Sequence, residues 1–352
     1  MLQQVEGRQR TADKLPTFAA IDDWWYPVRI SCEQCSSELT ARYKTSILPP
    51  LSDTHTAFAD LTGGYGVDTL FLSTCFAHTD YIEQNDELCR IMQHNKELWS
   101  RVQNSNTTIN VHNTSAEQFM QTAGQYDLIF VDPARRDAYG GKVFRLEDCT
   151  PNMMELLPIL HTHLTPNGRI LLKLSPMLDI TQALSSLTTH YWQVFVVAVK
   201  NEVKEVLLTT GANTIHAVNI CATHTDRFVF SHEDEKNAPM QIASDIKQYI
   251  YEPNAAIIKA GAYRLIGERY GLQKLDTNTH LYTSNTLLPD FPGRVWEVID
   301  AEIKDPKKQL DTQAKYSIIS RNHPFMPEQI RKKYKLHDGD DYYLLAARHQ
   351  GK

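Results

Sequence analysis

The sequence predicts an α/β fold, in which a doubly wound, seven-stranded sheet with an antiparallel last strand precedes a smaller α+β region. Between residues 56 and 211, strand-like apolar runs alternate with helical patterns, which is typical of a mostly parallel sheet with helical crossovers. Only Lys200-Asn201-Glu202 separates the last two runs, and this connection is too short for a parallel crossover. After Gly211 the regular alternation stops.

The individual elements follow from the apolar periodicity. The expected strands are 56–61, 79–83, 107–111, 126–131, 168–175, 191–199 and 203–210, and the expected helices are 67–77, 86–99, 115–122, 150–164 and 179–187. Before them, Ser31 and Gln34 fit a capping box for a helix that reaches about Ile47, where Pro49 and Pro50 end it.

The C-terminal part contains shorter elements. We expect two strands within 215–230, a loop at 231–239, a helix at 254–270, strands near 280–284, 294–299 and 315–320, a basic helix at 327–336 and a strand at 342–347. The predicted organisation is an N-terminal helical segment at 1–50, the sheet domain at 51–211, and smaller units at 212–252 and 253–352.

The bulk properties favour a cytoplasmic protein that has no membrane partner. No apolar run reaches the length of a membrane span, the N-terminus lacks the pattern of a signal peptide, and six scattered cysteines fit a reducing compartment. The net charge is −6, but residues 301–352 carry 11 Lys/Arg and 7 Asp/Glu, which makes this segment +4 and the remainder −10. A basic tail is compatible with a phosphate-bearing partner and also with an ordinary solvated surface.

The first strand runs into a glycine-containing turn that suits a nucleoside ligand. Asp60, Thr62, Gly64 and Gly66 lie in this turn, and Glu83 ends the next strand 23 positions after Asp60. Glycines let the backbone approach a ligand closely, and a carboxylate at this distance can hold ribose hydroxyls. The alternative is a glycine turn in a sheet that binds no cofactor.

Asp132-Pro133-Ala134-Arg135 follows the fourth strand, at the carboxyl edge where such sheets place reacting groups. Asp132, Pro133 and Arg135 are therefore candidate catalytic residues. Arg136 can hold a phosphate or stack on a base, or it can simply pair with a neighbouring acid.

Together these features resemble the class I S-adenosylmethionine-dependent methyltransferases. The sequence resembles in particular a bacterial group that carries a small ferredoxin-like unit followed by a THUMP-like C-terminal region. Five segments extend this resemblance: Ser31–Lys44, Lys173–Asp179, Asn201–Glu205, Tyr251–Ala255 and Phe291–Arg294. The resemblance places the ferredoxin-like unit at 212–252 and the THUMP-like domain at 253–352.

The resemblance also implies roles for individual residues. S-adenosylmethionine would lie against Asp60, Thr62, Gly64 and Gly66, with Glu83 and Gln84 at the ribose, Ser115 and Ala116 at the adenine, and Asp132 near the methyl group. Asp132 and the backbone beside it would accept hydrogens from a target amine, so that its nitrogen faces the methyl group.

The sequence leaves several functions open. Asp132-Pro133 resembles the start of the Asp-Pro-Pro-aromatic motif of amino-group methyltransferases, and this resemblance favours a base amino group in RNA as the acceptor. Enzymes that methylate carbon 5 of a pyrimidine need a cysteine after the next strand, where Leu174-Ser175-Pro176 has none. Methylation of a protein or small molecule and a non-catalytic RNA-binding role are the alternatives. Candidate RNA-binding residues are Arg321, Arg331, Lys332 and Lys335, although a basic helix can also be merely solvated.

A metal site is not expected. Cys32 and Cys35 have the spacing of a metal or redox pair, but no second pair stands at zinc-like spacing. Both cysteines fall on the apolar face of a predicted helix, so burial is the favoured interpretation.

Overall fold

The computed structural model describes residues 2–349, apart from 49–55, 105–106, 136–145 and 188–191. The chain forms two compact units: the first contains Met1–Val199 and Val203–Thr214, and the second contains Lys200–Glu202 and Ile215–Lys352. Within the described part, no helix is long and apolar enough to span a bilayer.

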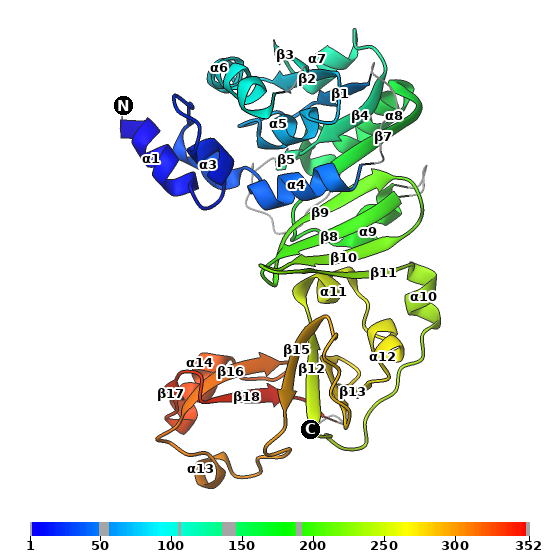
Figure 1. Ribbon diagram of the computed structural model, residues 1–352. Helices are drawn as coiled ribbons and strands as arrows, with labels where there is room; N and C mark the ends of the chain where they lie inside the picture. Colours follow the sequence, from blue (N-terminus) through cyan, green and yellow to red (C-terminus); the bar gives the residue numbers. More distant parts are fainter. Residues whose placement is uncertain (1, 49–55, 105–106, 136–145, 188–191, 350–352) are drawn as a thin grey trace. The chain divides into compact units, whose positions relative to one another are not determined.

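The first unit contains seven strands of the main sheet, in the order β8-β9-β7-β4-β1-β2-β3 (Figure 1). Strands β1, β2, β3, β4 and β7 run parallel, whereas β9 is antiparallel to β7. The predicted doubly wound fold class with an antiparallel strand after the parallel ones is therefore confirmed, but the main sheet has nine strands and not the predicted seven. The bounds are β1 (Ala57–Asp60), β2 (His78–Glu83), β3 (Thr108–Asn113), β4 (Tyr126–Val131), β7 (Leu164–Leu174), β8 (Trp192–Val199) and β9 (Glu202–Thr210).

The short connection between β8 and β9 is a two-residue turn. Lys200 and Asn201 have φ values of 51° and 65°, the left-handed conformation that a hairpin turn requires at both central positions. This turn reverses the chain, and β9 consequently enters the sheet between β7 and β8.

Helices connect the parallel strands of the sheet, and most of them begin at a polar cap. The helices are α5 (Val67–Ser73), α6 (Asp86–Gln103), α7 (Ala116–Met120), α8 (Met153–Thr162) and α9 (Ile180–Ser186). The side chains of Asn85, Ser115, Asn152 and Asp179 each accept a backbone N–H at the start of the helix that follows. The central strands β1 and β4 are buried almost throughout, which matches a parallel sheet covered on both faces.

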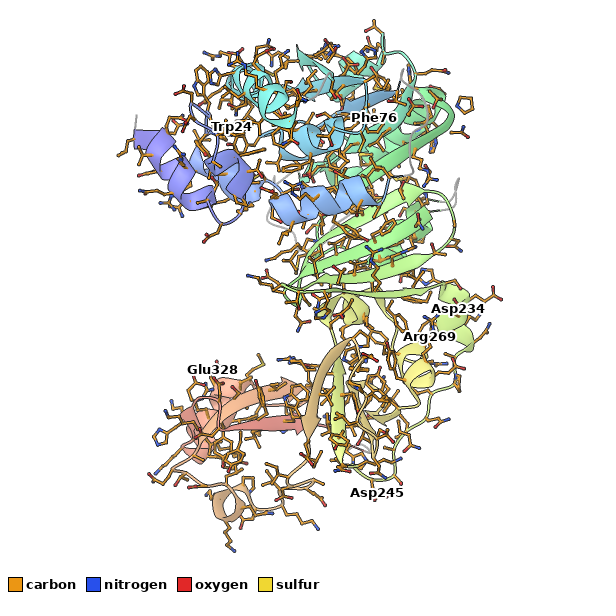
Figure 2. The ribbon with its side chains drawn as sticks, viewed as in Figure 1. Trp24, Phe76, Asp234, Asp245, Arg269 and Glu328 are labelled. Carbon is orange, nitrogen blue, oxygen red and sulfur yellow. The ribbon has the colours of Figure 1, made fainter. Side chains whose placement is uncertain are left out.

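Four short helices precede the sheet: α1 (Leu2–Thr11), α2 (Pro16–Ala19), α3 (Arg29–Gln34) and α4 (Glu38–Ser46). They share an aromatic core with the sheet domain. The ring of Trp24, labelled in Figure 2, lies 4.3 Å from that of Phe18, and its Nε1 donates to the hydroxyl of Tyr65 at 2.9 Å. This helical segment is therefore part of the first unit.

The prediction of a single helix from Ser31 to Ile47 is wrong, because the helix is interrupted after Gln34 and a second helix begins at Glu38. Cys35 has extended backbone angles, and Ser37, not Ser31, caps the second of the two helices through Thr40 N–H. The expected burial of the cysteines is confirmed for Cys32, and Cys35 is half-buried. Burial raises the thiol pKa of both residues, to about 11 for Cys32.

The second unit begins with the hairpin of β10 (Ile215–Ile220) and β11 (Thr225–Phe230), followed by α10 (His232–Asn237). A four-stranded sheet, in the order β13-β14-β12-β15, comes next along the chain. Its strands are β12 (Tyr249–Pro253), β13 (Gln273–Asp276), β14 (Thr279–Ser284) and β15 (Gly293–Glu297), and its helices are α11 (Ala255–Ala260) and α12 (Leu265–Tyr270).

The chain ends in a parallel three-stranded sheet in the order β17-β16-β18. The elements are α13 (Pro306–Gln309), β16 (Lys315–Arg321), α14 (Pro327–Tyr334), β17 (His337–Asp338) and β18 (Tyr342–Ala347). Ile330 on α14 packs with Tyr316, Ile318 and Leu336 in a small core of their own.

Two predictions for the second unit are wrong. The expected loop after Ser231 contains helix α10, because Ser231 and Asp234 form a reciprocal capping box. Asp234 is labelled in Figure 2. The expected helix at 254–270 is two helices, because Gly261 adopts a left-handed φ of 85° and ends α11.

Candidate functional site

The glycine loop between β1 and α5 has a backbone that only glycine adopts easily. Gly64 and Gly66 have φ values of 54° and 82°, and Gly66 caps α5. Gly63 is needed for a different reason, because a Cβ there would lie 2.1 Å from the ring of Tyr81. Within this loop Gly63 and Gly66 are buried and Gly64 is half-buried, so Gly64 is the glycine whose backbone is partly accessible.

Glu83 joins this loop to the end of β2. Its Oε2 accepts from Gly64 N–H at 2.9 Å and its Oε1 accepts from Asn85 N–H at 2.8 Å, while the Tyr81 hydroxyl donates to Gly64 C=O at 2.6 Å. Each carboxylate oxygen has a second lone pair. Glu83 thus holds the loop and retains the capacity to accept two further hydrogen bonds, which suits a ribose diol.

Asp60 supports the loop from inside the protein. It is 1% exposed, its Oδ2 accepts from Thr69 Oγ1 at 2.6 Å, and its Oδ1 accepts from Thr62 N–H at 3.0 Å. Burial raises the pKa of this carboxyl to about 7, against the lowering effect of these hydrogen bonds. Asp60 contacts the loop directly, through Thr62 N–H. Asp60 would therefore affect a bound ligand only through the loop backbone or a water molecule.

The Asp132 motif meets the glycine loop because β4 pairs with β1. The backbone N–H of Asp132 donates to Thr62 Oγ1 at 2.6 Å, which links the two motifs directly. The Asp132 side chain is 39% exposed, and Pro133 is half-buried. Arg135 belongs to a short strand, β5 (Ala134–Arg135); its side chain and all of Arg136 lie outside the described residues.

The remaining sequence-predicted residues lie at the ends of β2 and β3. Gln84 is exposed, and its carbonyl accepts from Asn113 at 3.0 Å. The Ser115 hydroxyl caps α7 by accepting from Gln118 N–H at 3.2 Å, and Ala116 is buried beside it. The predicted cofactor residues therefore follow consecutive strand ends along one edge of the sheet.

Comparison with known proteins identifies this architecture. Residues 249–292 match a family of ferredoxin-like domains, and residues 293–352 match the family described as THUMP domain-like. A crystal structure described as a "putative methyltransferase" from Porphyromonas gingivalis W83 is 32% identical, with a TM-score of 0.88, and the alignment covers 99% of this chain and 86% of that one. The chain belongs to this methyltransferase family. No curated protein matches the sequence.

The methyltransferase is thus a class I, S-adenosylmethionine-dependent enzyme with ferredoxin-like and THUMP-like parts at its C-terminus, as the sequence resemblance implied. The matched ranges differ from the expected ranges 212–252 and 253–352. The glycine loop and the unfilled acceptor capacity of Glu83 fit the nucleoside part of that cofactor.

More distant structures align with part of the chain. The precorrin 8W decarboxylase of Methanobacterium thermoautotrophicum is 18% identical over 51% of this chain and 92% of its own, with a TM-score of 0.34. A "putative rRNA-methylase" from Clostridium thermocellum is 12% identical over 49% and 94%, with a TM-score of 0.35. Similarity at this level carries no information about the substrate of the present methyltransferase.

The sequence interpretation missed several residues of the methyltransferase site. Lys173 of β7 donates to Asp132 Oδ2, and the same ammonium lies 3.5 Å from Asp68 Oδ2. A lysine within the apolar run Ile170–Leu174 was the available signal, because a charge in a buried strand needs a partner. Cys149 of strand β6 (Cys149–Thr150) pairs with Arg135 in a two-stranded ladder beside the Asp132 motif.

The expected RNA-binding residues do not form one basic helix face. Helix α14 ends at Tyr334, and Lys335 follows it in a left-handed conformation with φ of 56°, so Lys335 lies outside the helix that was predicted to include it. Arg331 pairs with Asp338 at 2.5 Å, and Arg321 pairs with the buried Glu252 at 2.5 Å. Lys332 and Lys335 remain exposed.

One group of potential metal ligands lies outside this site, although the sequence suggested none. Ligand atoms of Cys221 and His224, in the turn between β10 and β11, and of Asp226 on β11 lie within 4.8 Å of one another. Asp226 also accepts hydrogen bonds from Asn219 and Asn254. Those protein contacts already account for the position of the carboxylate.

Proposed function

We propose that this methyltransferase methylates RNA, with an exocyclic amino group of a base as the acceptor. The observation that carries this proposal is the position of Asp132 and Pro133, beside the glycine loop and at the end of a central strand. An oxygen acceptor followed by proline at this position resembles the motif of amino-group methyltransferases.

The chemistry requires little from the protein beyond positioning. The sulfonium of the bound cofactor supplies an activated methyl group. Asp132 accepts a hydrogen from the target amine, and the backbone carbonyl beside it accepts a second, which aims the nitrogen lone pair along the line of transfer. Asp132 is thus an orienting acceptor, and the half-exposed position of its side chain lets a substrate reach it.

The THUMP-like match over 293–352 supports RNA as the substrate class. THUMP domains deliver RNA in other enzymes, and this part of the chain carries the excess of basic residues. Lys332 and Lys335 offer exposed charges that can neutralise phosphates. Arg321 and Arg331 contribute less to this surface, because each already faces a carboxylate.

The test is transfer of labelled methyl groups by the full chain to total RNA, protein and small-molecule fractions. The wild type should label RNA, and Asp132→Ala should reduce the rate by roughly 100-fold or more because the acceptor is no longer aligned. Asp86→Ala is the control, since Asp86 is an exposed acid on α6 that pairs only with Arg90 in the described structure. Label in the protein or small-molecule fraction alone would contradict an RNA substrate.

A carbon-5 mechanism is distinguished by Cys149, which β6 places opposite Arg135. Methylation of an amino group needs no cysteine nucleophile, so Cys149→Ser should retain activity within about 3-fold. A decrease of roughly 100-fold or more, together with a covalent RNA complex in the wild type, would favour carbon-5 chemistry.

A further inference from the structure

A buried cluster of charges connects the candidate acceptor Asp132 with the interior of the first unit. The cluster contains two ammonium groups and three carboxylates from four elements and the end of a fifth: Lys44 on α4, Asp68 on α5, Asp132 after β4, Lys173 on β7 and Glu205 on β9. Charges at this depth are costly unless they are paired and hydrogen-bonded.

The inner part of the cluster is a closed set of contacts. The Lys44 ammonium lies 2.6 and 2.7 Å from the two oxygens of Glu205 and 3.2 Å from Asp68 Oδ1. The Ser36 hydroxyl donates to Asp68 Oδ2 at 2.6 Å. Lys44 and Glu205 are almost completely buried, so these contacts fix Asp68 in one position.

Lys173 forms the connection from this inner set to the sheet edge. Its side chain is 13% exposed, and its ammonium bridges Asp68 Oδ2 at 3.5 Å and Asp132 Oδ2 at hydrogen-bonding distance. In the described part of the chain, no donor contacts the other oxygen of Asp132, Oδ1. The two oxygens of Asp132 therefore have different environments.

The charge balance keeps Lys173 protonated. Burial alone would lower its pKa, but the carboxylates of Asp132, Asp68 and Glu205 outweigh burial and hold the pKa well above the ordinary value. Burial acts against the charge of Asp68 as well, yet Lys44 and Lys173 lower the pKa of that carboxyl. Lys173 is consequently a fixed cation and a hydrogen-bond donor, and it is not suited to accept a proton from a substrate.

We propose that Lys173 is a positioning residue for methyl transfer: it holds Oδ2 of Asp132 so that Oδ1 is presented to the acceptor. This inference rests on the proposed role of Asp132 and does not depend on the acceptor being RNA. The Asp68–Lys44–Glu205 set anchors Lys173 from behind. An acidic residue at a strand end becomes directional because a buried cation fixes one of its two oxygens.

A solely structural role for Lys173 makes a different prediction. In that case, removal of Lys173 would lower stability and would impair the enzyme by the same factor whether or not Asp132 is intact. If Lys173 acts through Asp132, the effects of substituting Lys173 and Asp132 are not independent. The second substitution then lowers kcat only slightly once the first is present.

The experiment compares Lys173→Met, Lys173→Arg, Asp132→Asn and the Lys173→Met/Asp132→Asn double variant in the full chain. For each variant, kcat is measured with the substrate fraction (RNA, protein or small molecules) that the wild-type enzyme methylates. The Kd of S-adenosylmethionine is measured by calorimetry. Lys96→Met is the matched control, because Lys96 is a half-buried lysine whose ammonium contacts the Ile109 carbonyl at 2.7 Å, away from Asp132.

Lys173→Met should lower kcat about 100-fold and leave Kd within about 3-fold, whereas Lys173→Arg should recover at least about a tenth of wild-type kcat because it keeps the charge. Adding Lys173→Met to the Asp132→Asn variant should lower kcat further by less than about 3-fold. Wild-type-like kcat in Lys173→Met, or effects that multiply in the double variant, would overturn the proposal.

A spectroscopic measurement covers the case in which Lys173→Met does not fold or no fraction is labelled. The side-chain ammonium signals of Lys173 and Lys44 are assigned in ¹⁵N-lysine-labelled protein from their disappearance in Lys173→Arg and Lys44→Arg. Asp132→Asn should shift the Lys173 signal much more than that of Lys44. An unmoved Lys173 signal would refute the contact, whereas absence of labelled RNA would count only against the RNA substrate.

Discussion

Among single residues, Thr62 connects the two motifs of the candidate site. Its hydroxyl accepts from Asp132 N–H at 2.6 Å, while its own N–H donates to Asp60 at 3.0 Å. A glycine lacks that hydroxyl, so the threonine provides the direct link between the glycine loop and the candidate acceptor.

Glu83→Ala should weaken S-adenosylmethionine binding roughly 5- to 100-fold, because removal of a buried hydrogen-bonding partner costs on the order of 1–3 kcal/mol. Both Glu83 oxygens are held by backbone N–H groups, which fixes the carboxylate for a ligand. Titration calorimetry checks this affinity, and Glu87→Ala on the exposed first turn of α6 is the control. An unchanged Kd in Glu83→Ala would exclude Glu83 from the cofactor site.

Asp60 should make the stability of the enzyme dependent on pH. Burial raises its pKa from 3.8 to about 7 in the folded protein, so the folded state holds a proton that the unfolded chain has released. That stabilising contribution is complete below about pH 4 and disappears as the pH rises through about 7. Between about pH 4.5 and about pH 8, the free energy of unfolding of the wild type should fall relative to that of Asp60→Asn by on the order of a few kcal/mol.

Urea unfolding of the two proteins at both pH values measures this difference. Asparagine is the appropriate replacement, because it keeps the shape of the side chain and an acceptor for Thr62 N–H. A stability difference that stays constant across this pH range would show that Asp60 does not titrate within it.

Among the secondary-structure elements, the strands follow from sequence more reliably than the helices. A buried strand such as β4 is a compact apolar run, and Tyr126–Val131 was predicted with the bounds that the structure has. Helices that depend on tertiary contacts were joined or missed. The interruption between α3 and α4 coincides with the Ser36–Asp68 hydrogen bond at 2.6 Å, to a partner 32 residues away that local periodicity does not reveal.

Helix α14 and the residue that ends it offer a test of RNA binding. Lys332→Glu/Lys335→Glu should weaken RNA binding by roughly tenfold or more, because two phosphates are no longer neutralised. The slope of log affinity against log salt should become shallower by about 0.7 for each such phosphate on a single strand. Lys333 is left unchanged, because its ammonium packs over the rings of Phe325 and Tyr334 at 4.4 and 5.3 Å.

Lys307→Glu/Lys308→Glu on α13 is the matched control, since it changes the net charge equally on another exposed element of the same unit. Filter binding at several salt concentrations compares the two variants. Equal weakening in both would indicate a general charge effect, and unchanged affinity in both would remove α14 from the RNA-binding surface.

In the molecule as a whole, the candidate cofactor site and the basic C-terminal part belong to different compact units. All described residues that we assign to the cofactor belong to the first unit, and Lys332 and Lys335 belong to the second. Each unit also has hydrophobic clusters of its own.

Cofactor binding should therefore stabilise the first unit selectively. S-adenosylmethionine at about 100 times its Kd contributes about 2.7 kcal/mol, which should raise the melting temperature of a unit of this size by roughly 5–10 °C. Differential scanning calorimetry should show one transition that moves with the cofactor and another that does not. The shift should shrink in Glu83→Ala, and equal movement of both transitions would contradict selective stabilisation.

Patterns along the chain were sufficient to predict the parallel strands of the sheet, the antiparallel strand β9 and the positions of the glycine loop and the Asp132 motif, but not the full number of strands in the sheet. These features depend on short-range properties: apolar periodicity, the conformational freedom of Gly64 and Gly66, and the two-residue turn at Lys200 and Asn201. Each can be recognised from neighbours in the sequence.

Only the tertiary structure shows which distant residues contact Asp132. Lys173 is 41 residues from Asp132 and Glu205 is 161 residues from Lys44, yet the order of strands and the packing of α4 bring these charges together. Packing also paired Arg321 with Glu252 and Arg331 with Asp338, although the charge pattern suggested that both arginines bind RNA. Burial makes such pairing necessary, because a charge removed from water requires a partner that local sequence does not specify.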